Sequence, residues 1–187
     1  MPIPRLRISD SVVIVIDVQE RLIPSIPDRA ALSANCAVLL RMASELSIPA
    51  ILTEQYVQGL GRTIPEIAEA MADPAARFEK TRFSAAIDLV VDQFRAWRRS
   101  TVIVAGIEAH VCVLQTVLDL HSQGFQCFVC TDAISAAQRD QIAPALERMR
   151  AAGAVPTGIM SAMYELMGDA AHPSFRNCLG LAKLLRS

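Results

Sequence analysis

The sequence predicts an α/β fold: one domain over residues 1–187, with a mostly parallel β-sheet and helices on both faces. Short apolar, β-branched runs alternate along the whole chain with segments whose apolar residues recur at helical spacing. This alternation implies crossover connections, which join parallel strands. A chain of 187 residues that is 52% hydrophobic can also bury a core of its own. Because no linker, internal repeat or low-complexity tract interrupts the pattern, we expect one domain.

The N-terminal half begins with a purely apolar strand over residues 11–16, which ends at Asp17. A carboxylate at the end of a buried strand needs a partner, because burying it unpaired is costly. A helix is predicted over 29–47 from its apolar face, with Asp28 as a plausible N-cap. The next expected elements are a strand at 50–56, a loop at 57–63, a short helix at 64–71 and a short strand at 77–81.

The C-terminal half contains the clearest strand-to-helix junction. After an amphipathic helix over 86–97, a β-branched strand over 101–105 is broken by Gly106, and a helical pattern then runs over 109–123. Cys112 therefore lies in the first turn of a helix that directly follows a parallel strand. The remaining expected elements are a strand at 125–131, a helix at 138–152, a strand at 154–157, and helices at 160–167 and 173–185.

Composition and charge argue against several function classes. The formal net charge is −1 and the basic residues are scattered, so no electrostatic footprint for nucleic acid is present. No stretch approaches the roughly 18 continuous apolar residues of a membrane span, and the N-terminus lacks the apolar core of a signal peptide. Five cysteines at unpatterned positions do not form a disulfide framework. We therefore expect a cytoplasmic protein with no nucleic-acid or membrane partner.

Three chemically complementary side chains fall at the carboxyl ends of predicted strands: Asp17, Lys80 and Cys112. In a parallel sheet these ends lie along one edge, where ligands bind. The N-terminus of a helix favours a thiolate at Cys112, a carboxylate can accept the thiol proton, and an ammonium can stabilise both anions. Taken singly, each has an ordinary interpretation: a core cysteine, a loop-capping carboxylate and a surface cation. Their common placement favours catalysis.

Other cysteine and histidine patterns do not indicate a metal or redox site. The histidines at 110, 121 and 172 have no metal-ligand spacing, so neither a metal nor a cofactor is expected. Cys127 and Cys130 match a redox spacing, but in a strand they point to opposite faces and are interpreted as core residues. His121 lies near the far end of the helix that Cys112 begins, about 13 Å away, which is too distant for a base.

Three motifs give the sequence a resemblance to a known family. Val-Ile-Asp17-Val-Gln19, Glu79-Lys80-Thr-Arg-Phe-Ser84 and Gly106-Ile-Glu-Ala-His-Val-Cys112 resemble the signatures of the isochorismatase-like cysteine hydrolases, in the family's order and spacing. Thr53-Glu-Gln-Tyr56 and Gly168-Asp-Ala-Ala-His-Pro173 are most similar to the isochorismatase-domain-containing branch. The resemblance covers nearly the whole chain. It implies a Rossmann-like, doubly wound sheet with strand order 3-2-1-4-5-6.

The resemblance also implies roles for individual residues. Cys112 would be the nucleophile, Asp17 the base and Lys80 the third member of a catalytic triad. A cis peptide would join Ile107 to Glu108, and the backbone N–H groups of Glu108 and Cys112 would form an oxyanion hole. The residues expected to bind the substrate are Gln19, Tyr56, Phe83 and Ile107, although aromatic residues at such places are as often part of the core.

Departures from the family narrow the expected function. Nicotinamidases carry an Asp-x-His metal motif after the second strand, where this chain has Gln55-Tyr56-Val-Gln58, which argues against a metal-dependent nicotinamidase. Glu108 and His110 stand where amidase members usually carry small residues or threonine. We expect a metal-independent cysteine hydrolase that cleaves a small carbonyl compound, preferably an amide, through a thioester. We also expect it to form homo-oligomers. The alternatives are an isochorismatase-type vinyl-ether hydrolase and a non-catalytic binding or scaffold member.

Overall fold

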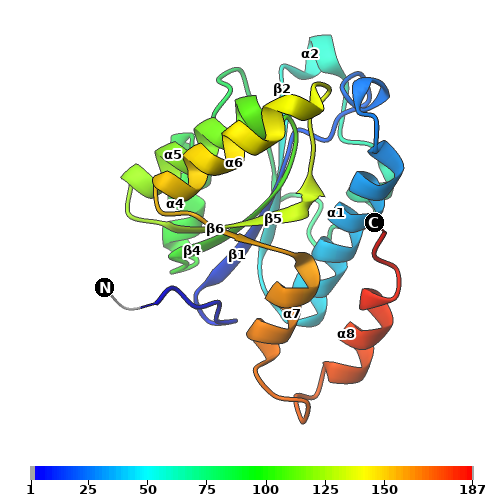
Figure 1. Cartoon of the computed structure of the whole chain (residues 1–187), viewed down its shortest axis with the longest axis vertical. Coiled ribbons are helices and arrows are strands. Elements are labelled where there is room, and N and C mark those ends of the chain that lie inside the picture. Colours follow the sequence, from blue (N-terminus) through cyan, green and yellow to red (C-terminus); the bar gives the residue numbers. More distant parts are fainter. Residues whose placement is uncertain (1–2, 187) are drawn as a thin grey trace.

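A computed structural model describes residues 3–186 and shows one six-stranded, all-parallel sheet in the order β3-β2-β1-β4-β5-β6 (Figure 1). The predicted α/β fold and strand order are confirmed. The strands are β1 (Ser11–Ile16), β2 (Ala50–Gln55), β3 (Arg77–Lys80), β4 (Thr101–Gly106), β5 (Gln126–Ile134) and β6 (Val155–Thr157).

Helices cover both faces of this sheet. The α-helices are α1 (Arg29–Glu45), α2 (Val57–Leu60), α3 (Pro65–Ala68), α4 (Asp88–Ala96), α5 (Leu114–Ser122), α6 (Ile142–Ala151), α7 (Ile159–Met167) and α8 (Phe175–Ala182). Helices α1, α7 and α8 pack together on one face, and α4, α5 and α6 lie on the other (Figure 1). Among residues 3–186, no helix is both long enough and apolar enough to cross a membrane.

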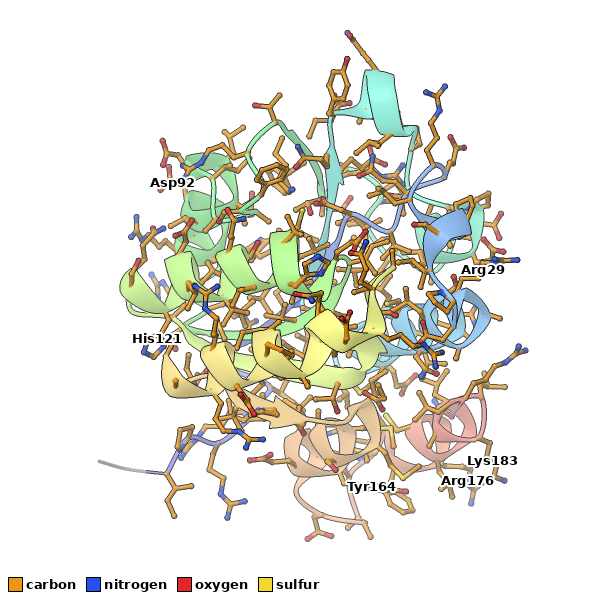
Figure 2. The ribbon with its side chains drawn as sticks, turned by 45° about the horizontal axis from the view of Figure 1, so that its top comes forward. Arg29, Asp92, His121, Tyr164, Arg176 and Lys183 are labelled. Atoms are coloured by element: carbon orange, nitrogen blue, oxygen red, sulfur yellow. The ribbon has the colours of Figure 1, made fainter. Side chains whose placement is uncertain are left out.

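Several charged side chains lie exposed on the outer surfaces of the helices. Figure 2 shows Arg29 on α1, Asp92 on α4 and Arg176 on α8 pointing away from the sheet. His121 lies at the C-terminal end of α5, away from the helix start that carries Cys112. This placement agrees with its interpretation as a residue outside the site.

The register of the central strands sets the position of the site. Every residue of β1 is buried, and Ile16 at its end pairs with Thr53 of β2 on one side and Gly106 of β4 on the other. Gln55 at the end of β2 pairs in turn with Lys80 of β3. The carboxyl ends of four neighbouring strands therefore meet along one edge.

The backbone of Gly106, at the end of β4, faces the end of β1 in a conformation that leaves no room for a side chain. Its φ of 116° lies in a region that favours glycine, and a Cβ there would lie 2.1 Å from the carbonyl oxygen of Ile16. No side chain fits in that space. The chain can consequently turn from β4 into the segment that carries Cys112 without pushing the two strands apart.

Four local predictions differ from the structure. The expected loop at 57–63 contains the four-residue helix α2, and β5 continues to Ile134, where it pairs with Gly106 after a register shift. The helix expected over 109–123 begins with a π-helical turn, Ala109–Val113, before α5 starts. The carboxylate of Asp28 does not cap α1, because it accepts a hydrogen bond of 2.6 Å from the Ser135 hydroxyl instead.

Candidate active site

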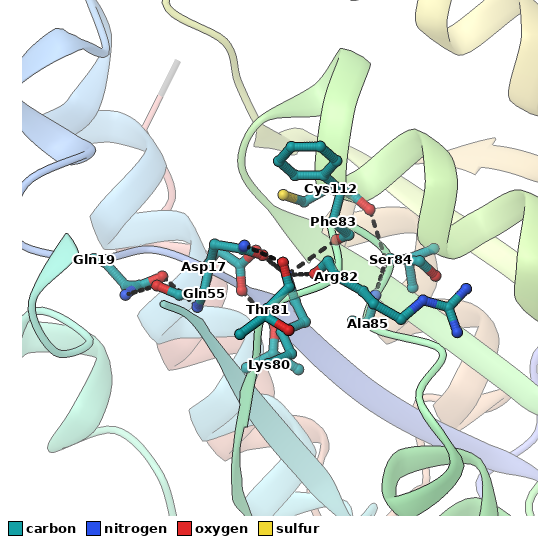
Figure 3. A network of polar contacts seen from close by, with 12 residues as sticks. Asp17, Gln19, Gln55, Lys80, Thr81, Arg82, Phe83, Ser84, Ala85 and Cys112 are labelled. Atoms are coloured by element: carbon teal, nitrogen blue, oxygen red, sulfur yellow. Dashed lines mark hydrogen bonds and ion pairs between the residues drawn. The ribbon is translucent and has the colours of Figure 1, made fainter. Parts of the chain in front are cut away.

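Asp17 is positioned by the end of β1. Its φ of 53° is left-handed, so the chain turns sharply where the strand stops. Its fully buried carboxylate accepts hydrogen bonds from the Lys80 Nζ atom at 2.6 Å and from the Thr53 hydroxyl at 2.8 Å. The expected need of this carboxylate for a partner is thus met by a neighbouring strand end (Figure 3).

Lys80 is held at the end of β3 by several acceptors. Besides Asp17, its ammonium donates to the Gln55 Oε1 atom at 2.7 Å and to the carbonyl oxygens of Phe83 and Arg82 at 3.0 and 3.1 Å. A buried ion pair is tolerated only when such additional hydrogen bonds compensate for lost hydration. Lys80 is therefore a fixed buried cation that orients Asp17.

Cys112 lies in the π-helical turn between β4 and α5. The peptide bond from Ile107 to Glu108, just before this turn, is cis. The Glu108 backbone N–H favours a lower pKa of the Cys112 thiol, and the Glu108 carbonyl accepts hydrogen bonds from the N–H groups of Val111 and Val113. The cysteine is 7% exposed, so a small part of it remains accessible. The structure thus brings Cys112, Asp17 and Lys80 to one place (Figure 3).

The electrostatic setting of Cys112 differs from the expectation of a thiolate at a helix start. Burial, followed by the negative charge of Asp17, raises the pKa of the Cys112 thiol to about 12, although Lys80 and the Glu108 N–H act in the opposite direction. Burial also raises the pKa of the Asp17 carboxyl, against the lowering influence of Lys80 and Thr53. The expectation of a thiolate failed because burial and a neighbouring carboxylate dominate the pKa of the thiol. Attack by Cys112 therefore requires removal of its proton.

Gln55 is a further residue that contacts the candidate site and that sequence reasoning did not identify. Its Oε1 atom accepts the hydrogen bond from Lys80, and its Nε2 atom donates to the Thr81 carbonyl at 2.7 Å. Gln55 belongs to a motif that resembles the family, but the sequence offers no signal that its side chain reaches Lys80. The register that pairs these two residues supplies the explanation.

Gln19 is expected to bind substrate, but its side-chain amide is hydrogen-bonded to backbone groups of the protein. Its Nε2 atom donates to the carbonyl oxygens of Gln55 and Gly61, and its Oε1 atom accepts from the Gln55 N–H at 2.7 Å. The side chain is buried, and these bonds fix the loop after β2 against β1. Gln19 thus supports Gln55, which in turn contacts Lys80.

The other expected substrate residues lie in different environments. Phe83 is 55% exposed, and its carbonyl is held by Lys80, so its ring lies near the site (Figure 3). Tyr56 is 54% exposed and lines a cavity of about 530 Å³ between the loops that follow β2 and β3. The Ile107 side chain is fully buried and belongs to the core, because it directly continues the buried strand β4.

The side chain of Glu108 extends toward the segment that follows β5. Its Oε2 atom accepts a hydrogen bond of 3.3 Å from the Ala137 N–H and lies 3.6 Å from the Nδ1 atom of His110. No group of three or more His, Cys, Asp or Glu side chains arranged to hold a metal ion is found among residues 3–186.

A second buried carboxylate, Glu54, holds the loop before α3. It accepts hydrogen bonds from the Thr63 N–H at 2.7 Å and from Arg62 at 2.8 Å, and lies 3.8 Å from Arg77. Burial alone would raise the pKa of Glu54, but its bonds to Thr63 and Arg62 prevail and lower it below its ordinary value of 4.5. Glu54 therefore fastens the segment that Gln19 also contacts.

This network predicts a loss of stability in acid. Because the pKa of Glu54 is lower in the folded state than in the unfolded chain, its contribution is fully present above pH 4.5 and is lost as the pH falls through the folded-state pKa. Glu54→Gln should lower the free energy of unfolding at pH 7 by about 1–3 kcal/mol and weaken its acid dependence. Urea unfolding between pH 3 and 7 measures both. The control Glu79→Gln removes an exposed partner of Arg62 and should change little.

Known proteins are similar to this chain over most of its length. The sequence matches the Isochorismatase domain family over residues 11–160. It is 38% identical over 173 residues to isochorismatase domain-containing protein 2 of Pongo abelii, covering 92% of this chain and 83% of that relative. The solved structure of the MAR1 ribonuclease from Caenorhabditis elegans is similar with a TM-score of 0.91 and 36% identity, covering 95% of this chain and 92% of that chain.

Two solved structures of YcaC are also similar. YcaC from Pseudomonas aeruginosa, with hexane-2,5-diol and covalent acrylamide, has a TM-score of 0.88 and 28% identity, covering 97% of this chain and 93% of that chain. YcaC from Escherichia coli, described as an octameric hydrolase of unknown specificity, has a TM-score of 0.85 and 25% identity over 100% of both chains.

Proposed function

The chain belongs to the isochorismatase domain family, and from this premise we propose that it is a cysteine hydrolase that cleaves a small amide through a thioester, without a metal ion. The observation that carries the proposal is the buried Asp17–Lys80 pair beside Cys112. Burying three polar groups at one strand edge costs free energy, and such clusters of buried titratable groups are typical of active sites. A thiol next to a carboxylate base has the composition that nucleophilic acyl transfer requires.

The acylation step uses each of these groups. Asp17 takes the proton of the Cys112 thiol as the Sγ atom attacks the carbonyl carbon of the amide, whose oxygen becomes negatively charged. The backbone N–H groups of Glu108 and Cys112 donate to this oxygen, and each well-placed donor is worth about 2.7–4 kcal/mol of barrier. Asp17 then returns the proton to the departing amine as the C–N bond breaks. A thioester at Cys112 remains.

Hydrolysis of the thioester repeats these reaction steps with water as the nucleophile. Asp17 takes a proton from a water molecule whose oxygen attacks the thioester carbonyl, the C–S bond breaks, and the proton returns to the Cys112 sulfur. Lys80 transfers no proton in this scheme, and its ammonium is hydrogen-bonded to Asp17, Gln55 and two carbonyl oxygens. Its role is to hold and orient the carboxylate that moves the proton.

The alternatives explain fewer of these features. A vinyl-ether hydrolase of the isochorismatase type does not need the thiol, and a scaffold protein needs none of the three groups. The interaction of the Cys112 thiol with Asp17 therefore favours acyl transfer over both. We also propose that the protein assembles with copies of itself in the cytoplasm, an arrangement for which the octameric Escherichia coli YcaC is the precedent.

The proposal is tested by a screen of small amides with the wild-type protein and Cys112→Ala. Release of amine or ammonia is measured, and intact-protein mass spectrometry detects the acyl group on Cys112. Hydrolysis that depends on Cys112, with an acyl adduct at that residue, supports the proposal. Equal hydrolysis by both proteins, or vinyl-ether cleavage that survives the substitution, contradicts it.

Phe83 should contribute to substrate binding once an amide is found. A half-exposed ring beside the site can bury apolar substrate surface worth about 1 kcal/mol. Phe83→Ala should therefore raise KM about fivefold for amides with an apolar acyl group and leave kcat nearly unchanged. Steady-state kinetics measure this difference. Tyr164→Ala removes an exposed ring from α7 and serves as the control, for which KM should not change.

A further inference from the structure

We propose that Thr116 is a positioning residue that ties the loop after β3 to the turn that carries Cys112. This inference rests on the proposed function, because it concerns the geometry of the same nucleophile. Thr116 lies in α5, one turn beyond Cys112, and its side chain is fully buried.

The hydroxyl of Thr116 makes two hydrogen bonds to different parts of the site. It donates to the backbone carbonyl of Cys112 at 2.6 Å, and it accepts from the backbone N–H of Ala85 at 2.8 Å. Ala85 is also fully buried and lies 31 residues before Thr116 in the sequence. One hydroxyl therefore joins the nucleophile's backbone to a distant loop.

The loop that Thr116 holds is the one that Lys80 also holds. The Lys80 ammonium donates to the carbonyl oxygens of Arg82 and Phe83 near the start of the loop, and the Thr116 hydroxyl receives the N–H of Ala85 at its end. Phe83 is itself one of the residues that Lys80 holds, two residues before Ala85. The loop is thus anchored once to the Asp17–Lys80 pair and once to the Cys112 turn (Figure 3).

The hydrogen bond from Thr116 to the Cys112 carbonyl has an ordinary explanation. Threonine in a helix often donates to the carbonyl four residues earlier, and that bond alone carries no functional meaning. The bond from Ala85 distinguishes Thr116, because removing the hydroxyl would leave a buried N–H without this acceptor. Substitution of a purely structural residue would lower the stability of the protein and leave the reactivity of Cys112 in the folded protein unchanged. Substitution of a positioning residue would also change that reactivity.

The acylation of Cys112 by 4-nitrophenyl acetate measures reactivity without knowledge of the natural substrate. Its carbonyl carbon bonds to the Sγ atom, 4-nitrophenolate leaves, and the thiol proton passes to Asp17. The rate of nitrophenolate release is compared in the wild type, Thr116→Val, Thr116→Ala and Thr116→Ser, each well below its unfolding temperature. Thr101→Val, which changes a buried threonine at the opposite end of β4, is the matched control.

Thr116→Val and Thr116→Ala should acylate about tenfold more slowly, because a small displacement of the nucleophile is costly. Thr116→Ser retains the hydroxyl and should react at close to the wild-type rate, as should Thr101→Val. Wild-type rates in folded Thr116→Val or Thr116→Ala overturn the inference alone, as does a slow Thr116→Ser. If wild-type Cys112 is not acylated at all, the proposed function fails and this inference fails with it.

Discussion

Cys112→Ala should lose acyl transfer altogether, with a rate at least about 10⁴-fold below that of the wild type. The reason is chemical: alanine has no atom that can form the thioester, and neither Asp17 nor Lys80 is placed to replace it, because the two are bonded to each other. Nitrophenolate release from 4-nitrophenyl acetate, and amine release from any amide identified in a screen, measure the loss. Mass spectrometry should find no acyl group on the variant.

Cys178→Ala is the matched control for this substitution. It also removes a buried, free thiol, but from α8, a helix of the opposite face that contributes nothing to the site. It should keep wild-type rates and lose only some stability from the small cavity it creates. Residual hydrolysis by Cys112→Ala within tenfold of the wild type would assign the reaction to another group and overturn the nucleophile.

The three charged or nucleophilic residues of the site were predictable because each lies at the carboxyl end of a predicted strand or in the turn that follows it. A parallel sheet places such positions at one edge whatever their separation in sequence, so Asp17, Lys80 and Cys112 had to lie near one another. Their actual contacts depend on register. Pairing of Ile16 with Thr53, and of Gln55 with Lys80, decides which side chains touch.

The residues that hold the site in place were not predictable in the same way. Gln19, Gln55 and Thr116 each make a hydrogen bond to a backbone group in a loop, and no periodic pattern in the sequence records the path of a loop. The protonation of Cys112 was predicted wrongly for a related reason. A sequence shows that a helix begins near Cys112, but it does not show how deeply the thiol is buried or that the charge of Asp17 affects its pKa more than the charge of Lys80 does.

Asp17→Asn should separate the ionisation of Cys112 from catalysis. In the wild type burial is the largest cause of the rise in the pKa of the thiol to about 12; the Asp17 charge also raises it, and the Lys80 ammonium lowers it. Asparagine removes the negative charge and leaves Lys80 in place, so the pKa of Cys112 should fall. The thiolate absorbs near 240 nm, and the difference between Asp17→Asn and its double variant with Cys112→Ala follows this titration.

Hydrolysis by Asp17→Asn should nevertheless drop by about 10²–10⁴-fold, because no carboxylate remains to pass the proton to the leaving amine or to activate water. A more ionised but slower Cys112 is the expected result, and it distinguishes a base from a residue that merely tunes the thiol. Asp132→Asn, which changes a carboxylate that accepts the Ile159 N–H at the start of α7, should alter neither measurement. Hydrolysis within tenfold of the wild type would remove Asp17 from proton transfer. An unchanged thiol titration would instead show that its charge does not act on Cys112.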